Sequence, residues 1–231
     1  MRTALTTLIL AGALTSTSGF AQNAPAGPTN DKAQKTYKEA ENYLHQRNTS
    51  AALESFKKAD KQDGGHCSSC QKQMIKYGAE LGDWKTAELA GEEELAAAQG
   101  DKDIAIAHYQ LAVILMDEGV QKHKDEFFSR GHDEVTKALA AAPKFPEAVF
   151  LDGRLLAQLK QDDAAKSRFE EYVKMRPAEG PDHQRAMRYI GNPELARARM
   201  APAFAVTTLD GQHISMDDLQ GKVVLLDFWA T

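Results

Sequence analysis

The feature that most constrains the fold is a helical pattern that itself repeats. From Lys32 to Arg199 the chain is rich in Ala, Leu, Lys, Glu and Gln, its apolar residues stand at helical spacing, and Gly, Asp or Pro interrupts them. Small residues recur where two helices would cross closely, and aromatic residues recur where a groove between hairpins would need filling. The positions that carry this pattern are Ala40, Tyr43, Ala52, Phe56 and Ala59; Leu81 to Trp84 and Ala87; Val135, Ala138 and Pro143; and Gly153, Leu156, Ala165, Phe169 and Pro177. The region is therefore predicted to be mainly α and built from helical hairpins.

This pattern resembles the tetratricopeptide repeat, a helix–turn–helix unit of about 34 residues. The resemblance implies an array of about three to four hairpins over residues 32–199, with extra residues at 121–129. Each hairpin buries its apolar face only against its neighbours, so a stable array needs several of them. The resemblance also implies that the concave face of the array binds a protein partner or a disulfide substrate. An irregular helical bundle is the alternative.

After Met200 the hydrophobic pattern changes from helical to alternating. Residues 201–215 alternate like β-strands, with Asp210-Gly211 as a hairpin turn. Residues 216–221 are predicted to form a short helical or turn segment. Val223 to Phe228 is almost continuously apolar, which is typical of a strand covered on both faces. A domain boundary is therefore expected near Arg199.

The same C-terminal residues carry a second resemblance. The residues that carry it are Ala201-Pro202-X-Phe204, Leu209-Asp210-Gly211, Ser215, Asp218-Leu219-X-Gly221-Lys222 and Val223 to Thr231. This pattern is similar to the N-terminal part of exported thioredoxin-like (redoxin) proteins, in which Phe-Trp-Ala-Thr is followed by Trp-Cys-X-X-Cys. Residues 200–231 are therefore interpreted as the incomplete start of an α/β thioredoxin-like domain. The chain is expected to be truncated before the catalytic C-x-x-C.

The thioredoxin-like resemblance implies a thiol-disulfide oxidoreductase with a role in cell redox homeostasis. In that family a cysteine thiolate at a helix N-terminus attacks disulfides, and a second cysteine resolves the mixed disulfide. Asp227 matches the buried acid that moves a proton for these cysteines, and Trp229 matches the aromatic residue that shields them. An acid inside an apolar run is expected to have a raised pKa, which suits a proton relay. Alternatively, Asp227 pairs with a lysine and Trp229 only packs in the core.

The first residues are typical of an export signal. Arg2 is followed by an apolar run from Ala4 to Leu14 and by Gly19-Phe20-Ala21, so residues 1–21 are predicted to be a signal peptide. The apolar run is too short to span a bilayer comfortably. Residues 22–31 are predicted to be a flexible linker. The protein is therefore expected to be exported, either periplasmic or secreted, without a membrane span once the signal is removed. An exposed N-terminal helix is the alternative.

The two cysteines form a C-x-x-C motif, Cys67-Ser68-Ser69-Cys70, which opens a predicted helix that continues to Tyr77. Export to an oxidising compartment favours a disulfide that staples the start of this helix. A redox-active pair and a metal site are the alternatives. Zinc would need two further ligands, of which only His66 is adjacent, and covalent haem would need a histidine at the position of Gln71.

Composition and motifs narrow the function. The net charge of −5 and the absence of a long Lys/Arg run give no electrostatic reason to expect nucleic-acid binding, and no cofactor motif is found. The leading hypothesis is an exported thiol-disulfide oxidoreductase with a partner-binding tetratricopeptide array. The alternatives are a non-enzymatic periplasmic repeat scaffold and a peroxiredoxin-type peroxide reductase, against which Trp229 and Thr231 argue. Whether this chain is itself an enzyme stays open.

Overall fold

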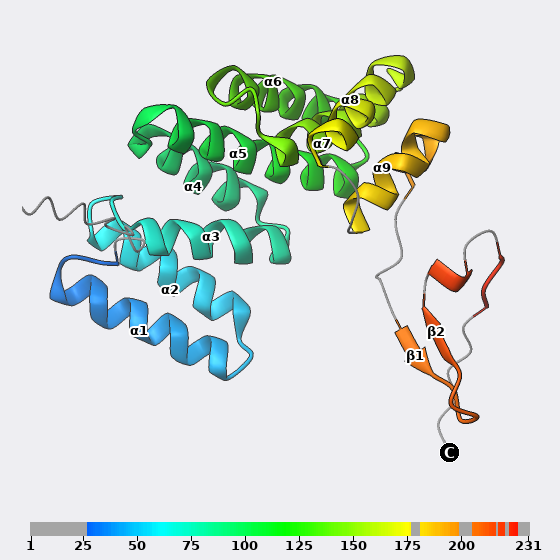
Figure 1. Cartoon of the computed structure of the whole chain (residues 1–231). Coiled ribbons are helices and arrows are strands. Elements are labelled where there is room, and N and C mark those ends of the chain that lie inside the picture. Colours follow the sequence, from blue (N-terminus) through cyan, green and yellow to red (C-terminus); the bar gives the residue numbers. More distant parts are fainter. Residues whose placement is uncertain (1–26, 177–180, 199–204, 216, 220–221, 226–231) are drawn as a thin grey trace, which may run out of the picture. The chain divides into compact units, whose positions relative to one another are not determined.

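The computed structural model describes residues 27–176, 181–198, 205–215, 217–219 and 222–225. The described part is mainly helical, as predicted, and its helices follow one another as antiparallel hairpins (Figure 1). The chain forms two compact units that divide between Ala98 and Gln99.

The first unit contains four helices, each packed against the next. These are α1 (Asp31–His45), α2 (Thr49–Gln62), α3 (Ser68–Leu81) and α4 (Trp84–Ala97). Side-chain caps fix where three of them begin, because Asn30, Asn48 and Asp83 each accept a hydrogen bond from a backbone N–H in the first turn. Gly82, in a left-handed conformation with φ of 72°, ends α3 and allows the tight turn into α4.

The core of the first unit forms around Phe56, which is fully buried on α2. Its ring meets that of Tyr37 edge-on at a centroid distance of 5.2 Å and stacks on that of Tyr77 at 6.2 Å. Small residues complete the cluster, among them Ala40 of α1, Ala52 of α2 itself and Ala90 of α4. The aromatic residue that the sequence pattern placed between the helices therefore organises this core.

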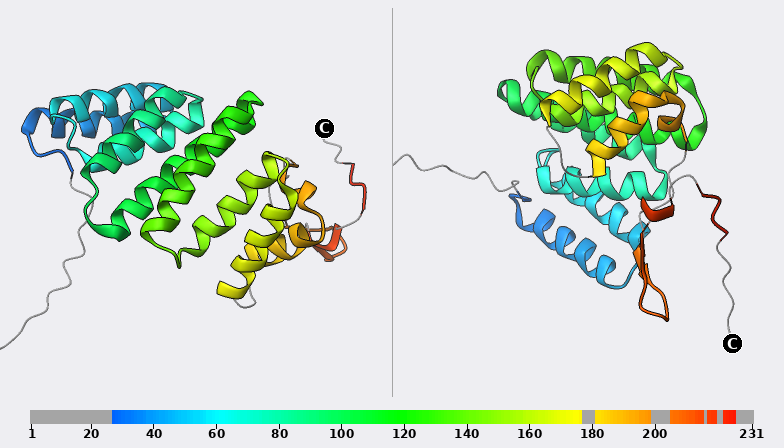
Figure 2. Two further views of the ribbon diagram at one scale, coloured as in Figure 1. Left: turned by 90° about the horizontal axis from the view of Figure 1, so that it is seen from above. Right: turned by 45° about the vertical axis from the view of Figure 1, so that its right-hand side comes forward.

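The second unit continues the hairpins (Figure 2). Its helices are α5 (Gly100–Lys122), α6 (Asp125–Ala141), α7 (Pro146–Gln158), α8 (Asp162–Met175) and α9 (Pro181–Gly191), followed by the 3-10 helix η1 (Pro193–Ala196). The extra residues at 121–129 lengthen the α5–α6 hairpin, whose turn contains His123 with φ of 54°.

Small residues allow close helix crossings in both units, as the sequence pattern predicted. A Cβ atom on Gly153 would lie 2.7 Å from the ring of Phe169, and one on Gly119 would lie 2.5 Å from the ring of Phe128. In the first unit a Cβ on Gly78 would lie 3.3 Å from the Cβ of Ala87. In these three hairpins an aromatic or alanine side chain of the second helix therefore fills the space that a glycine leaves on the first.

The C-terminal residues form a β-hairpin, which confirms the turn predicted at Asp210-Gly211. Strand β1 (Ala205–Thr207) pairs antiparallel with β2 (His213–Ser215). The N–H of Thr208 donates to the carbonyl of Gln212 at 2.8 Å, and Gly211 has φ of 84°. A short 3-10 helix, η2 (Asp217–Leu219), follows in the region predicted to be helical or turn.

The prediction of a buried strand from Val223 to Phe228 is wrong for its described residues. Val223, Val224 and Leu225 are not in a strand, and their side chains are exposed. An apolar strand is buried only when neighbouring strands and helices cover it, and the sheet within the described residues consists of β1 and β2 alone. Residues 226–228 lie outside the described part.

The predicted linker at residues 22–31 is also wrong at its C-terminal end. Asn30 caps α1, which begins at Asp31. Asp63 Oδ1 accepts hydrogen bonds from the N–H and Oγ1 of Thr29, each at 2.7 Å, and from the N–H of Asn30 at 3.1 Å. These bonds tie the segment before α1 to the end of α2. The predicted signal peptide lies outside the described residues, within which no helix is long and apolar enough to cross a membrane.

Candidate functional site

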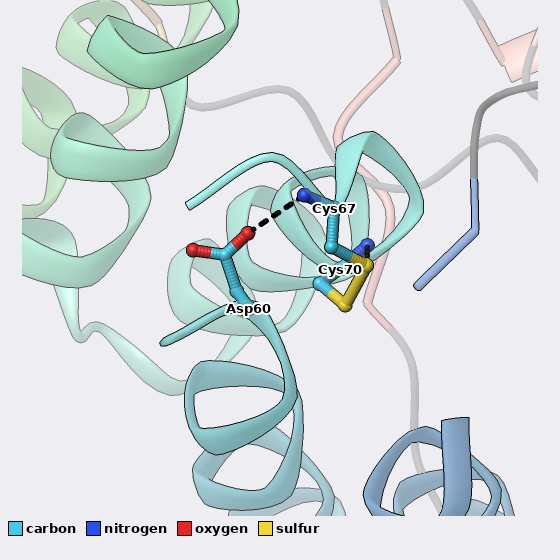
Figure 3. Close-up of side chains that lie close together, drawn as sticks. All are labelled: Asp60, Cys67 and Cys70. Atoms are coloured by element: carbon cyan, nitrogen blue, oxygen red, sulfur yellow. Dashed lines mark hydrogen bonds between the residues drawn. A yellow bond between two sulfur atoms is a disulfide. The ribbon is translucent and has the colours of Figure 1, made fainter. Parts of the chain in front are cut away.

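The cysteine pair lies at the N-terminus of α3, where Cys67 and Cys70 are joined in a disulfide (Figure 3). Cys67 is the N-cap residue, and its Sγ accepts a hydrogen bond from the N–H of Cys70 at 3.2 Å. Both cysteines are fully buried, packed against Ala59 of α2 and the partly buried ring of Tyr37 of α1. The helix predicted to open at this motif is therefore present.

A buried carboxyl group faces the disulfide. Asp60, on the last turn of α2, is 4% exposed, and its Oδ1 accepts a hydrogen bond from the N–H of Cys67 at 3.2 Å (Figure 3). A carboxylate oxygen of Asp60 and the two sulfur atoms lie within 4.8 Å of one another. Burial raises the pKa of Asp60 and the charge of Asp63 adds to this, while the bond from Cys67 and the proximity of His66 offset part of the rise.

A second carboxyl group approaches this cluster from α4. The side-chain N–H₂ of Gln71, which is itself buried, donates to the carbonyl of Gly65 at 2.9 Å and to Glu93 Oε2 at 3.4 Å. The pKa of Glu93 is raised, chiefly by burial and further by the charge of Asp60. Gln71 therefore interacts with two acids of raised pKa, Asp60 beside the disulfide and Glu93 on α4.

Asp60, Cys67 and Cys70 also form the group of potential metal ligands found in the described part of the chain. The disulfide engages both sulfur atoms, so a metal ion would need the reduced pair. Three donors are also one short of the four that a structural zinc site uses. The geometry around these residues fits redox chemistry or a structural staple better than it fits a zinc site.

The second unit carries a separate polar surface, which we call the α5–α7–α9 face and define by Tyr109 and Asp117 of α5, Glu147 and Arg154 of α7, and Asp182 of α9. Their charges act on one another: the pKa of Tyr109 is raised by burial and by the three acids, and lowered by Arg154. The Asp117 side chain is exposed, yet surrounding atoms keep enough water from its carboxyl group to raise its pKa against the effect of Arg154.

The site residues predicted from the sequence lie partly inside and partly outside the described part of the chain. Cys67 and Cys70 are brought together, whereas Asp227 and Trp229 lie outside the described residues. Asp60 was missed. Its signal in the sequence was an acid four residues after Phe56 and next to Ala59, which places it beside the buried face of α2.

Comparisons with known proteins support the helical fold. No protein-family description and no curated protein matches the sequence. Among solved structures, the MamA RS-1 ArsTM double mutant is similar over 73% of this chain and 88% of its own, with 19% identity and a TM-score of 0.55. A tetratricopeptide protein of Thermus thermophilus, TTC0263, matches 72% of this chain and 84% of its own, with 14% identity and a TM-score of 0.43. At this identity the MamA similarity shows the fold alone, a tetratricopeptide-type array of helical hairpins.

Proposed function

We propose that the chain is a protein-binding repeat array that serves an exported thiol-disulfide oxidoreductase of the thioredoxin-like type. The observation that carries the binding role is the α5–α7–α9 face. Helices α5 and α7 are the first helices of consecutive hairpins, and in stacked hairpin arrays such helices line the extended surface used for binding.

The composition of this face suits a protein partner. Tyr109 and Arg154 are half-buried and belong to the residue types enriched at the centres of protein interfaces. Asp117, Glu147 and Asp182 are exposed acids, of which Glu147 pairs with Arg176 and Asp182 with Arg185. A partner segment that bears Lys or Arg would gain from the partly desolvated carboxyl group of Asp117, because charge pairs strengthen as water is excluded.

The oxidoreductase part of the proposal rests on the sequence of residues 200–231. Their similarity to the start of a thioredoxin-like domain supports a proton-relay role for Asp227 and a shielding role for Trp229 in that domain. The array would then hold a protein or disulfide substrate while the thioredoxin-like domain supplies the chemistry. A repeat scaffold without its own chemistry and a peroxide reductase are the competing functions.

The binding role can be tested by site-specific photo-crosslinking in the native host. A benzoylphenylalanine at position 117 is compared with one at Lys166, an exposed residue of α8 outside the face. Because a probe at 117 removes the Asp117 carboxyl group, a third probe is placed at Ile106, an exposed residue of α5. We expect a discrete crosslinked protein from position 106 that is absent from position 166 and that is weakened both by the probe at 117 and by Asp117→Lys. The same crosslinks from positions 106 and 166 would refute the role of the face.

The oxidoreductase role has its own test, which the crosslinking result does not affect. The native gene product is isolated, its mass is compared with the 25.3 kDa of this chain, and peptides that follow Thr231 are sequenced. A heavier product with Trp-Cys-X-X-Cys after Thr231 supports disulfide exchange, and a single cysteine in a Pro-rich run supports peroxide reduction. A product that ends at Thr231 supports the scaffold.

A further inference from the structure

We propose that Cys67–Cys70 is a second thiol-disulfide exchange site, located in the repeat array, in which Asp60 transfers a proton to and from Cys67. This site would be distinct from the chemistry proposed for the thioredoxin-like domain. Its substrate would be an external dithiol, and it would pass two electrons between that dithiol and the array.

The geometry distinguishes the two sulfur atoms. Cys67 Sγ accepts the N–H of Cys70 at 3.2 Å, lies 3.4 Å from Ser69 Oγ, and sits at the N-cap position of α3. A helix N-terminus and hydrogen-bond donors stabilise a thiolate. Cys67 is therefore the better leaving group, and an incoming thiolate attacks Cys70 Sγ.

A structural staple alone gives no reason for the acids around the disulfide. Asp60 is buried and, besides the N–H of Cys67, is surrounded by Asp63 at the end of α2, His66 in the loop, Gln71 on α3 and Glu93 on α4. Burial and the charge of Asp63 disfavour ionisation of the Asp60 carboxyl group, against the opposing effects of Cys67, His66 and Gln71. A carboxyl group with a raised pKa that lies within 4.8 Å of a leaving sulfur atom can act as a general acid on it, directly after a small side-chain movement or through one water molecule.

The steps balance as follows. A thiolate of the external dithiol attacks Cys70 Sγ, forms a mixed disulfide and breaks the Cys67–Cys70 bond, and the electron pair leaves on Cys67 Sγ. Protonated Asp60 gives its proton to that sulfur. The second thiol of the donor loses its proton to solvent and attacks the donor sulfur of the mixed disulfide. Cys70 leaves as a thiolate and takes up a proton from solvent, as does Asp60. The donor is oxidised to a disulfide, and Cys67 and Cys70 are reduced to thiols.

Access to Cys70 requires a local movement, because both cysteines are fully buried in the oxidised chain. The partly exposed ring of Tyr37 packs on the disulfide from α1. A shift of this ring is the local movement that the proposal requires, because it exposes the disulfide from the α1 side and leaves α2 and α3 folded.

The test uses the full chain in its oxidised form with dithiothreitol as the probe. Reaction is stopped with acid, free thiols are alkylated, and the peptide that contains both cysteines is measured by mass spectrometry at several pH values. Rates are divided by the concentration of dithiothreitol thiolate. We expect a rate proportional to dithiothreitol, and a normalised rate that falls as pH rises through the pKa of Asp60, because the proton donor is then lost.

Two variants separate catalysis from structure. Asp60→Asn should lower the normalised rate about 10-fold or more and remove its pH dependence. Asp63→Asn should keep the rate at low pH and shift the inflection to lower pH, because the charge of Asp63 helps to raise the pKa of Asp60; it also serves if Asp60→Asn does not fold. A rate that is independent of dithiothreitol and equal to the unfolding rate would show that the disulfide is a staple and overturn the proposal. Unchanged pH profiles in folded variants would overturn the role of Asp60.

Discussion

Replacing Gly153 with alanine tests the packing rule that builds the array. The new Cβ would lie 2.7, 2.9 and 3.0 Å from three ring atoms of Phe169, against 3.4–4 Å for ordinary contact. The ring cannot easily retreat, because it is fully buried and its centroid lies 5.1 Å from that of Tyr189 and 5.7 Å from that of Phe150. Overpacking of this kind costs about 3 kcal/mol at the upper end, and the better helix propensity of alanine returns about 1 kcal/mol.

The expected net loss for Gly153→Ala is therefore about 2 kcal/mol, or about 10 °C in Tm for a unit of this size. Guanidinium unfolding followed by circular dichroism measures it. Gly191→Ala is the matched control, since no heavy atom lies within 4 Å of its Cβ position, and its stability should change by less than about 0.5 kcal/mol. In a double-mutant cycle, Phe169→Leu should relieve part of the Gly153→Ala loss. Wild-type stability of Gly153→Ala, or strict additivity in the cycle, would refute the close-crossing argument.

Three further changes test the polar and covalent contacts. Arg168→Met should cost about 3 kcal/mol in urea unfolding at neutral pH, because the fully buried Asp152 loses the guanidinium 2.7 Å from its carboxylate. Burial alone would raise the pKa of Asp63, but hydrogen bonds from the segment before α1 lower this pKa below the ordinary 3.8. The ionised Asp63 therefore contributes stability above about pH 4, and this contribution is lost as pH falls through the lowered pKa. Asp63→Asn should flatten the acid limb of a stability–pH curve. The double change Cys67→Ala/Cys70→Ala should lower the unfolding free energy by about 2 kcal/mol, the loop-closure value for a disulfide that closes so short a loop, when compared with the oxidised wild type.

The sequence predicted those parts of the fold that depend on neighbours along the chain. Gly153 and Phe169 belong to one hairpin, so their spacing carries the close crossing. The turn at Asp210-Gly211 was predictable for the same reason, because a left-handed residue between two alternating segments defines a hairpin locally.

The parts that depend on distant residues were not predictable in this way. Asp60 and Cys67 become neighbours because the loop between α2 and α3 folds back, and no spacing rule for helices reports that contact. Thr29 looked like linker because its immediate context is polar, yet Asp63 is 34 positions away and orders it. Val223 was assigned to a buried strand on hydrophobicity alone, which does not say whether other strands are there to cover it.

Two buried aspartates show how the structure separates a structural acid from a chemically available one. Asp152 of α7 is fully buried, with Arg168 Nε of α8 at 2.7 Å and His132 Nδ1 of α6 at 2.6 Å. Asp60 is almost as buried, but the charges that act on it include that of another acid, Asp63, and no ion pair joins it to a cation within the described residues. The first arrangement ties three helices together through one carboxyl group. The second favours a carboxyl group that changes protonation state beside a disulfide, and for this reason the redox proposal centres on Asp60.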